Sequence, residues 1–116
     1  MSGRPGKASR HWRNQRMTAV ALIPLGLWFI VSLLRQPTLE YAIVAGWFAR
    51  PLQALLAALL GSALLWHSLQ GIEVVLEDYV RGRALAVATG IARLVHVAAA
   101  VVLACAIYLL ARGGAP

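Results

Sequence analysis

Three long apolar runs constrain the fold of this chain more than any other feature. They extend from Met17 to Leu34, from Pro51 to Ile72 and from Ala84 to Leu110. The first two are free of charged residues, and the third is interrupted only by Arg93 and His96. A helix rises about 1.5 Å per residue, so each run can cross a hydrocarbon layer of roughly 30 Å. A single chain in lipid must satisfy its own backbone hydrogen bonds, which favours helices. We therefore predict an all-α integral membrane protein with three transmembrane helices, at about 17–34, 51–76 and 84–110.

Composition supports this class and argues against a nucleic-acid-binding protein. Charged residues make up 13% of the chain, against about 25% in soluble domains. The net charge is +7, but most of the basic residues lie in the first segment or beside the apolar runs. Those in the first segment are Arg4, Lys7, Arg10, Arg13 and Arg16. We predict a basic cytoplasmic tail at 1–16, a membrane anchor domain at 17–111 and a C-terminal tail at 112–116, with membrane lipid but no nucleic acid as a partner.

The distribution of basic residues also predicts the orientation. The tail and the loop with Arg81 and Arg83 carry more of them than the opposite side, with Arg35, Arg50 and Arg112. This places the N-terminus in the cytoplasm and the C-terminus outside. The first run exceeds the usual apolar region of a signal peptide, so we expect it to be retained. Pro24 predicts a bend in it.

The segment 35–50 reads as an external loop with a short interfacial stretch through Tyr41, Trp47 and Phe48. Small residues mark the faces through which helices associate in lipid. On the second and third helices they are Ala57, Gly61, Ser68, Ala86, Gly90 and Ala100. We therefore expect a partner chain to pack against these faces.

His67 is the most informative polar residue. It lies about ten residues, or roughly 15 Å, from the cytoplasmic end of its helix, and an ionisable group at that depth is a functional candidate. The alternative is a histidine that only hydrogen-bonds a neighbouring helix. Gly71, one turn away, clears the same helix face. Neutral imidazole is an axial ligand of haem iron, and helical bundles hold haem between facing helices.

Other polar residues lie closer to the boundary. The Tyr79 phenol could donate a hydrogen bond to a quinone, with Asp78 orienting it or passing protons, although an ordinary interfacial tyrosine fits the composition as well. Glu73 is expected to be hydrated and to have no catalytic role. Arg93 needs an anionic or polar partner, such as a haem propionate, Glu73 or another chain.

Two stretches together resemble one known family. They are HWRNQRMTAVALIPL at 11–25 and LWHSLQGIEVVLEDYV at 65–80. The first is similar to the N-terminal signature of the bacterial succinate dehydrogenase hydrophobic membrane anchor subunit, the D-type subunit. The second is similar to its second helix and the exit from it, including the interval from the histidine to Asp-Tyr.

The resemblance implies a subunit of succinate:ubiquinone oxidoreductase with no residue for succinate chemistry on this chain. It also implies a bacterial inner membrane, with the C-terminus in the periplasm. A C-type cytochrome b anchor subunit would share haem b with it, an iron–sulfur subunit and a flavoprotein subunit would sit on the cytoplasmic face, and ubiquinone would be the substrate. It further implies that His67 is an axial ligand of the haem iron and that Tyr79 hydrogen-bonds the quinone beside Asp78. Arg16 could contact a haem propionate.

Three alternatives stay open on the residues alone. His96 shares a helix face with Arg93 and could be a second haem ligand within this chain, although a partner chain is the expected source. The chain could also be a haem-free structural anchor. A small multidrug transporter is the third alternative, but it would need a fourth span and an acid deep in the first helix, where 17–34 has none.

Overall fold

A computed structural model describes residues 7–113 of the chain, with side chains from residue 12 onward. This part folds into four helices, which are α1 (Lys7–Leu34), α2 (Tyr41–Phe48), α3 (Pro51–Tyr79) and α4 (Arg83–Ala111). Three of them, α1, α3 and α4, are long and apolar enough to cross a membrane. The predicted all-α class with three such helices is confirmed.

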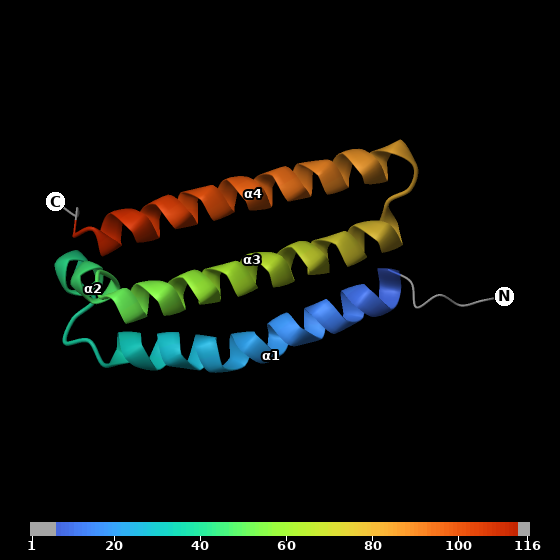
Figure 1. Cartoon of the computed structure of the whole chain (residues 1–116). Coiled ribbons are helices and arrows are strands. Elements are labelled where there is room, and N and C mark those ends of the chain that lie inside the picture. Colours follow the sequence, from blue (N-terminus) through green and yellow to red (C-terminus); the bar gives the residue numbers. More distant parts are fainter. Residues whose placement is uncertain (1–6, 114–116) are drawn as a thin grey trace.

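Local chemistry explains where the helices begin and bend. Pro51 occupies the first turn of α3, where its missing N–H costs no hydrogen bond. Gly82 has φ of 67° and precedes α4, so the tight connection between α3 and α4 uses a backbone conformation that favours glycine. Pro24 lies inside α1, and Figure 1 shows the two halves of this helix inclined to each other, as predicted.

Two helix ends differ from the predicted positions. Helix α1 begins at Lys7 rather than near Met17, because Met17 marks where the charge-free run starts and not where helical backbone starts. Helix α3 continues to Tyr79, past the predicted end at 76. The backbone of Glu77 and Asp78 continues the helix while their charged side chains are solvated, so the helix does not end where the apolar run ends.

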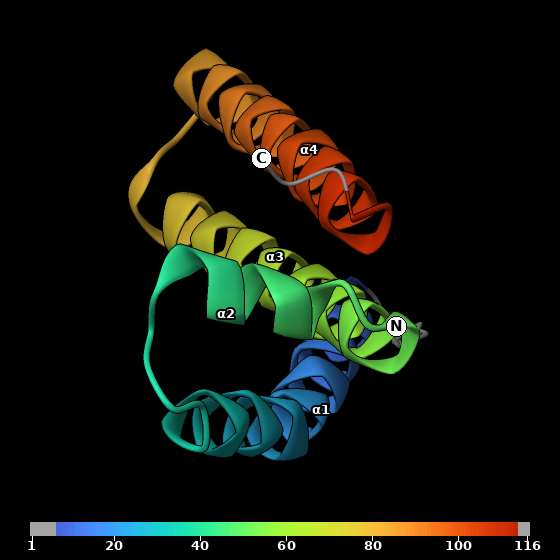
Figure 2. The same ribbon diagram turned by 90° about the vertical axis from the view of Figure 1, so that its left-hand side faces the viewer.

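Helix α3 is the centre of the molecule. Figures 1 and 2 show α1 packed on one side of it and α4 on the other. Gly61 of α3 lies against the side chain of Leu103 on α4, and a Cβ at this position would collide with it. Ala57 is also buried. These two small residues therefore pack inside the chain, and the expectation that they face a partner is wrong. Gly90 of α4 is open.

Helix α2 closes the end of the bundle near the C-terminus through an aromatic cluster. Its Trp47 stacks on Trp28 of α1 with ring centroids 5.4 Å apart, and its Phe48 lies 6.2 Å from Phe29. Trp47 is only 7% exposed. The expected short element in this loop exists, and Trp47 packs inside the chain because α1 supplies an aromatic surface for it.

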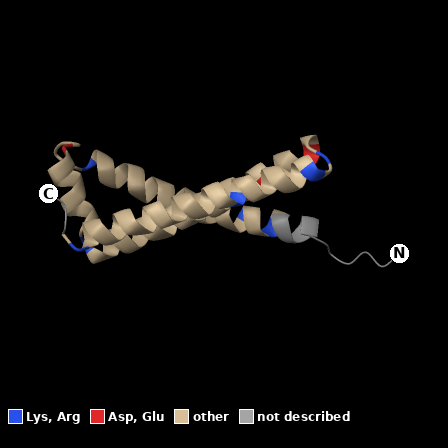
Figure 3. Cartoon of the chain, turned by 90° about the horizontal axis from the view of Figure 1, so that it is seen from above, with Lys and Arg blue, Asp and Glu red and all other residues tan. Residues whose placement is uncertain are grey.

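Many of the charged residues lie at the two ends of the described chain, and few lie between them (Figure 3). The start of α1 and the α3–α4 connection lie at one end, and α2 and the end of α4 lie at the other (Figure 1). A charge-poor middle between two charged ends matches the depth profile of a bilayer. Within this middle, polar side chains occur in few places, and they define the candidate site.

Candidate functional site

His67 is held by a residue of another helix. Its ring nitrogen Nδ1 lies 3.1 Å from the hydroxyl oxygen of Thr18 on α1. The same hydroxyl donates to the backbone carbonyl of Gln15, at 2.9 Å. Since Thr18 comes from the first apolar run and His67 from the second, the contact joins α1 to α3 within the apolar part of the bundle. Thr18 was not predicted from the sequence; the only signal was a hydroxyl at the start of a charge-free run.

A groove opens beside the His67 ring. Its volume is about 450 Å³, and it is lined by His67, Ser68, Gly71, Ile72, Val75 and Leu76 of α3. A Cβ added at Gly71 would have only one neighbour outside the helix within 4 Å, the side-chain nitrogen of Gln15 at 3.9 Å. The absent side chain therefore keeps this face open, as the spacing of His67 and Gly71 predicts.

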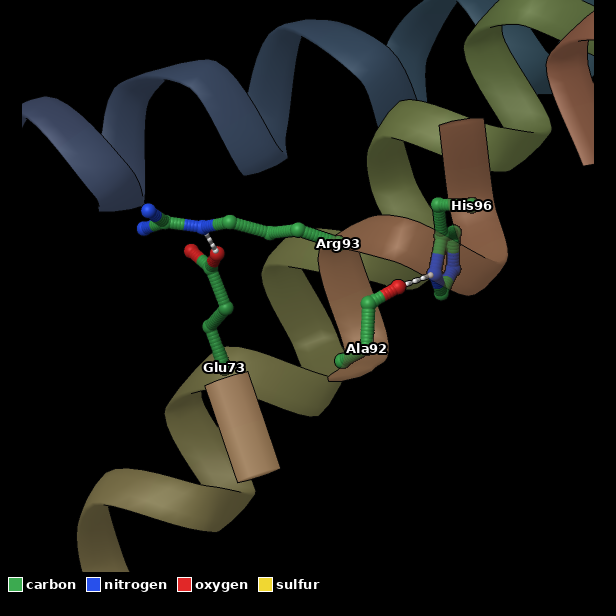
Figure 4. A network of polar contacts seen from close by, with 4 residues as sticks. All are labelled: Glu73, Ala92, Arg93 and His96. Atoms are coloured by element: carbon green, nitrogen blue, oxygen red, sulfur yellow. Dashed lines mark hydrogen bonds and ion pairs between the residues drawn. The ribbon is translucent and has the colours of Figure 1, made fainter. Parts of the chain in front are cut away.

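Arg93 and Glu73 form an ion pair between α4 and α3. The Arg93 Nε donates to a Glu73 carboxylate oxygen at 2.7 Å (Figure 4). The Glu73 side chain is 9% exposed and that of Arg93 is 63% exposed. The expectation that water hydrates Glu73 is therefore wrong: its carboxylate is buried within the chain, and α4 supplies its counterion. Of the partners considered for Arg93, Glu73 is the one that this chain supplies.

Gln70 lies one turn from Glu73 on α3 and is buried, at 4% exposure. Its side-chain oxygen has no hydrogen-bond partner within the described part of the chain. Buried polar groups are nearly always paired, so this oxygen marks a second polar position that the sequence analysis did not single out.

Both ring nitrogens of His96 are engaged. Nδ1 lies 2.7 Å from the Ala92 carbonyl, which can only accept, so Nδ1 carries the proton. Nε2 then accepts from the Ser68 hydroxyl at 3.1 Å. Figure 4 shows the ring turned back onto its own helix at Ala92. His96 thus ties α4 to α3 and has no free nitrogen for a metal in this arrangement.

The remaining predicted residues lie at the charged end of the bundle and are not brought together into a pocket. Tyr79, the last residue of α3, is 83% exposed. Asp78 beside it is also exposed. Arg16 on α1 lies over the ring of Trp12, with the guanidinium carbon 4.9 Å from the ring centroid. All three side chains are accessible to a ligand or another chain.

Comparisons with known proteins point to one family. Residues 2–109 match the family model described as succinate dehydrogenase/fumarate reductase transmembrane subunit. A succinate dehydrogenase hydrophobic membrane anchor subunit of Rickettsia bellii is 29% identical over 79 residues, which cover 68% of this chain and 63% of that relative. The Rickettsia prowazekii protein of the same name is 31% identical over 72 residues, which cover 62% of this chain and 58% of the relative. The chain thus spans about three fifths of the length of these curated relatives.

Proposed function

The chain belongs to the succinate dehydrogenase/fumarate reductase transmembrane subunit family, and from this membership we propose that it anchors a succinate:ubiquinone oxidoreductase in a bacterial inner membrane. In this proposal it shares haem b with a C-type anchor subunit and forms part of the ubiquinone site. An iron–sulfur subunit and a flavoprotein subunit bind at the end where α1 begins, and succinate chemistry takes place on those subunits. Family membership disfavours the small transporter alternative.

The observation that carries the haem proposal is the environment of His67. Its Nδ1 has Thr18 as a partner, whereas no residue in the described part of the chain hydrogen-bonds its Nε2. The ring borders a groove that Gly71 keeps open. An imidazole with one nitrogen held and the other free fits an axial ligand of iron. A bound haem would supply a one-electron carrier inside the membrane.

In this proposal the C-type subunit would supply the other residue that holds the haem. His96 is the other intramembrane histidine of this chain, but its two nitrogens are used by Ala92 and Ser68. A ligand from another chain would also bury the groove beside His67 between two subunits.

Basic residues complete the proposed haem environment. Arg16 is on α1, the helix whose Thr18 contacts His67, and its exposed side chain lies over the ring of Trp12. A guanidinium there can pair with a haem propionate. Arg93 is already paired with Glu73, so Arg16 is the better candidate for this contact.

Tyr79 and Asp78 form this chain's part of the proposed quinone site. The Tyr79 phenol is exposed at the end of α3, where it can donate a hydrogen bond to a quinone carbonyl at the membrane boundary. The neighbouring Asp78 carboxylate, exposed to water, can relay protons from the aqueous side. Neither side chain would have to move to contact a quinone, because both are exposed.

Replacing His67 tests the haem proposal. We expect His67→Ala to remove most of the b-type absorption of the purified complex, because this chain then offers no axial nitrogen. His96→Ala is the matched control: it removes the other intramembrane histidine and should retain the absorption. If His67→Ala kept the full haem signal, the ligand assignment would be wrong, and a haem-free anchor would fit the chain better.

A further inference from the structure

The Thr18 hydroxyl sits between two acceptor-capable groups, and this restricts where its proton can point. A threonine hydroxyl has one hydrogen to donate and an oxygen that accepts. The Gln15 carbonyl, 2.9 Å away, can only accept, so it takes the hydroxyl hydrogen. This i to i−3 bond is a common arrangement for threonine in a helix. The Thr18 oxygen is then left to accept from its other neighbour.

That other neighbour is Nδ1 of His67, 3.1 Å from the Thr18 oxygen. For this contact to be a hydrogen bond, Nδ1 must carry the proton. In a neutral imidazole the second nitrogen, Nε2, then has the free lone pair. The contact also fixes the rotation of the ring, because it ties one ring atom to a different helix. His96 is the contrast within the same chain: its Nδ1 is also protonated, but its Nε2 is used by Ser68.

We propose that Thr18 is a positioning residue for His67: it holds the imidazole as the tautomer whose Nε2 lone pair is free beside the groove. This inference rests on the proposed role of His67 as a haem ligand. Metal-bound histidines usually donate their other N–H to a nearby acceptor, and loss of that acceptor typically costs 10- to 100-fold in metal affinity. A hydrogen bond donated by Nδ1 would also raise the basicity of the imidazole, which would favour the more highly charged ferric state of an iron that it holds.

The test compares three variants of the purified complex. Thr18→Val keeps the shape and removes the hydroxyl, Thr18→Ser restores a hydroxyl, and Thr89→Val makes the same change on α4 as a control. The measurements are haem per complex, the haem midpoint potential from a redox titration and the ferric low-spin electron paramagnetic resonance spectrum. We expect Thr18→Val to weaken haem retention about 10- to 100-fold, to raise the midpoint potential and to change the spectrum. Thr18→Ser and Thr89→Val should resemble the wild type.

Several results would overturn the inference. One is a Thr18→Val complex with wild-type haem content, potential and spectrum. Another is an equal change in Thr18→Val and Thr18→Ser, which would indicate packing of the side chain and not its hydroxyl. If valine impairs assembly, Thr18→Ala provides a second variant without the hydroxyl. An unchanged haem midpoint potential and spectrum in Thr18→Ala would also contradict the positioning role of Thr18. His67→Ala separates the two claims: if it loses haem while Thr18→Val is normal, only the positioning role fails, whereas haem retained in His67→Ala refutes the ligand role.

Discussion

At the scale of single residues, three pairs of polar side chains join different helices in the part of the chain that the structure describes. His67 contacts Thr18, Arg93 contacts Glu73, and Ser68 contacts His96. In hydrocarbon no water replaces a missing partner, so an unpaired charge or donor costs far more than it does on a soluble surface. The three pairs join α3 to both of its neighbours, which makes the polar residues part of the packing.

The Glu73–Arg93 pair yields a stability prediction. Glu73→Leu leaves the Arg93 guanidinium without its carboxylate, and we expect it to lower the free energy of unfolding by about 1–3 kcal/mol. The double variant Glu73→Leu/Arg93→Leu removes both charges and should recover most of this loss, since neither charge is then left without its partner. The measurement is a denaturant titration of the purified protein in detergent.

Glu40 supplies the control for this experiment, because it is exposed at the start of α2. Glu40→Leu should change the unfolding free energy by less than about 0.5 kcal/mol. A double variant as unstable as Glu73→Leu alone would contradict the pairing, because the loss could then not come from an uncompensated Arg93.

At the scale of helices, the contact between α3 and α4 depends on a missing side chain. Gly61 lets the Leu103 side chain approach the α3 backbone, and small residues of this kind allow close helix packing in lipid. The periodicity of the sequence placed Gly61 on a packing face but could not say which helix faces it. A partner chain and α4 offer similar apolar surfaces, and only the tertiary structure distinguishes them.

Adding one methyl group at this contact tests it. Gly61→Ala should lower the unfolding free energy by about 0–2 kcal/mol, because the cost of moving the Leu103 side chain is partly offset by the better helix propensity of alanine. Gly90→Ala is the matched control: nothing lies within 4 Å of a Cβ at Gly90, and the better helix propensity of alanine can stabilise it by up to about 1 kcal/mol. Thermal unfolding in detergent measures both. Equal melting temperatures for the two variants would argue against close packing at Gly61.

At the scale of the whole molecule, the chain forms a thin bundle in which α4 has no buried residue within the described structure. The bundle measures 59 × 26 × 20 Å, long enough to cross a bilayer but only two helices thick in one direction. Its functional candidates therefore lie at open surfaces: His67 beside a groove and Tyr79 at one end. Such surfaces fit a subunit that acts together with other chains.

The end that carries Tyr79 yields the last prediction. Tyr79→Phe keeps the ring and removes the hydroxyl, so we expect quinone reduction by the complex to fall roughly tenfold, the effect of one lost hydrogen bond of about 1.4 kcal/mol. Succinate oxidation with a dye that accepts electrons before the membrane domain should persist. Tyr41→Phe at the opposite end is the control and should leave both rates unchanged. An equal fall of both rates in Tyr79→Phe would indicate misassembly and count against a quinone role.

The sequence by itself determined the fold class, because apolar runs of this length in a charge-poor chain have few alternatives to membrane-spanning helices. It also predicted the open face beside His67, since the spacing to Gly71 is a local property of one helix. It could not determine the helix ends at Lys7 and Tyr79, where charged residues continue the helix beyond the apolar run.

Only the tertiary structure decided which polar residues meet. Thr18 and His67 are 49 positions apart, and Glu73 and Arg93 are 20 apart. Helical periodicity assigns a residue to a face but carries no information on the neighbour of that face or on the rotation of one helix against another. The neighbour of a face and the relative rotation of two helices are set by many side-chain contacts across the bundle. For this reason the sequence predicted a hydrated Glu73, whereas the structure shows it buried and paired with Arg93.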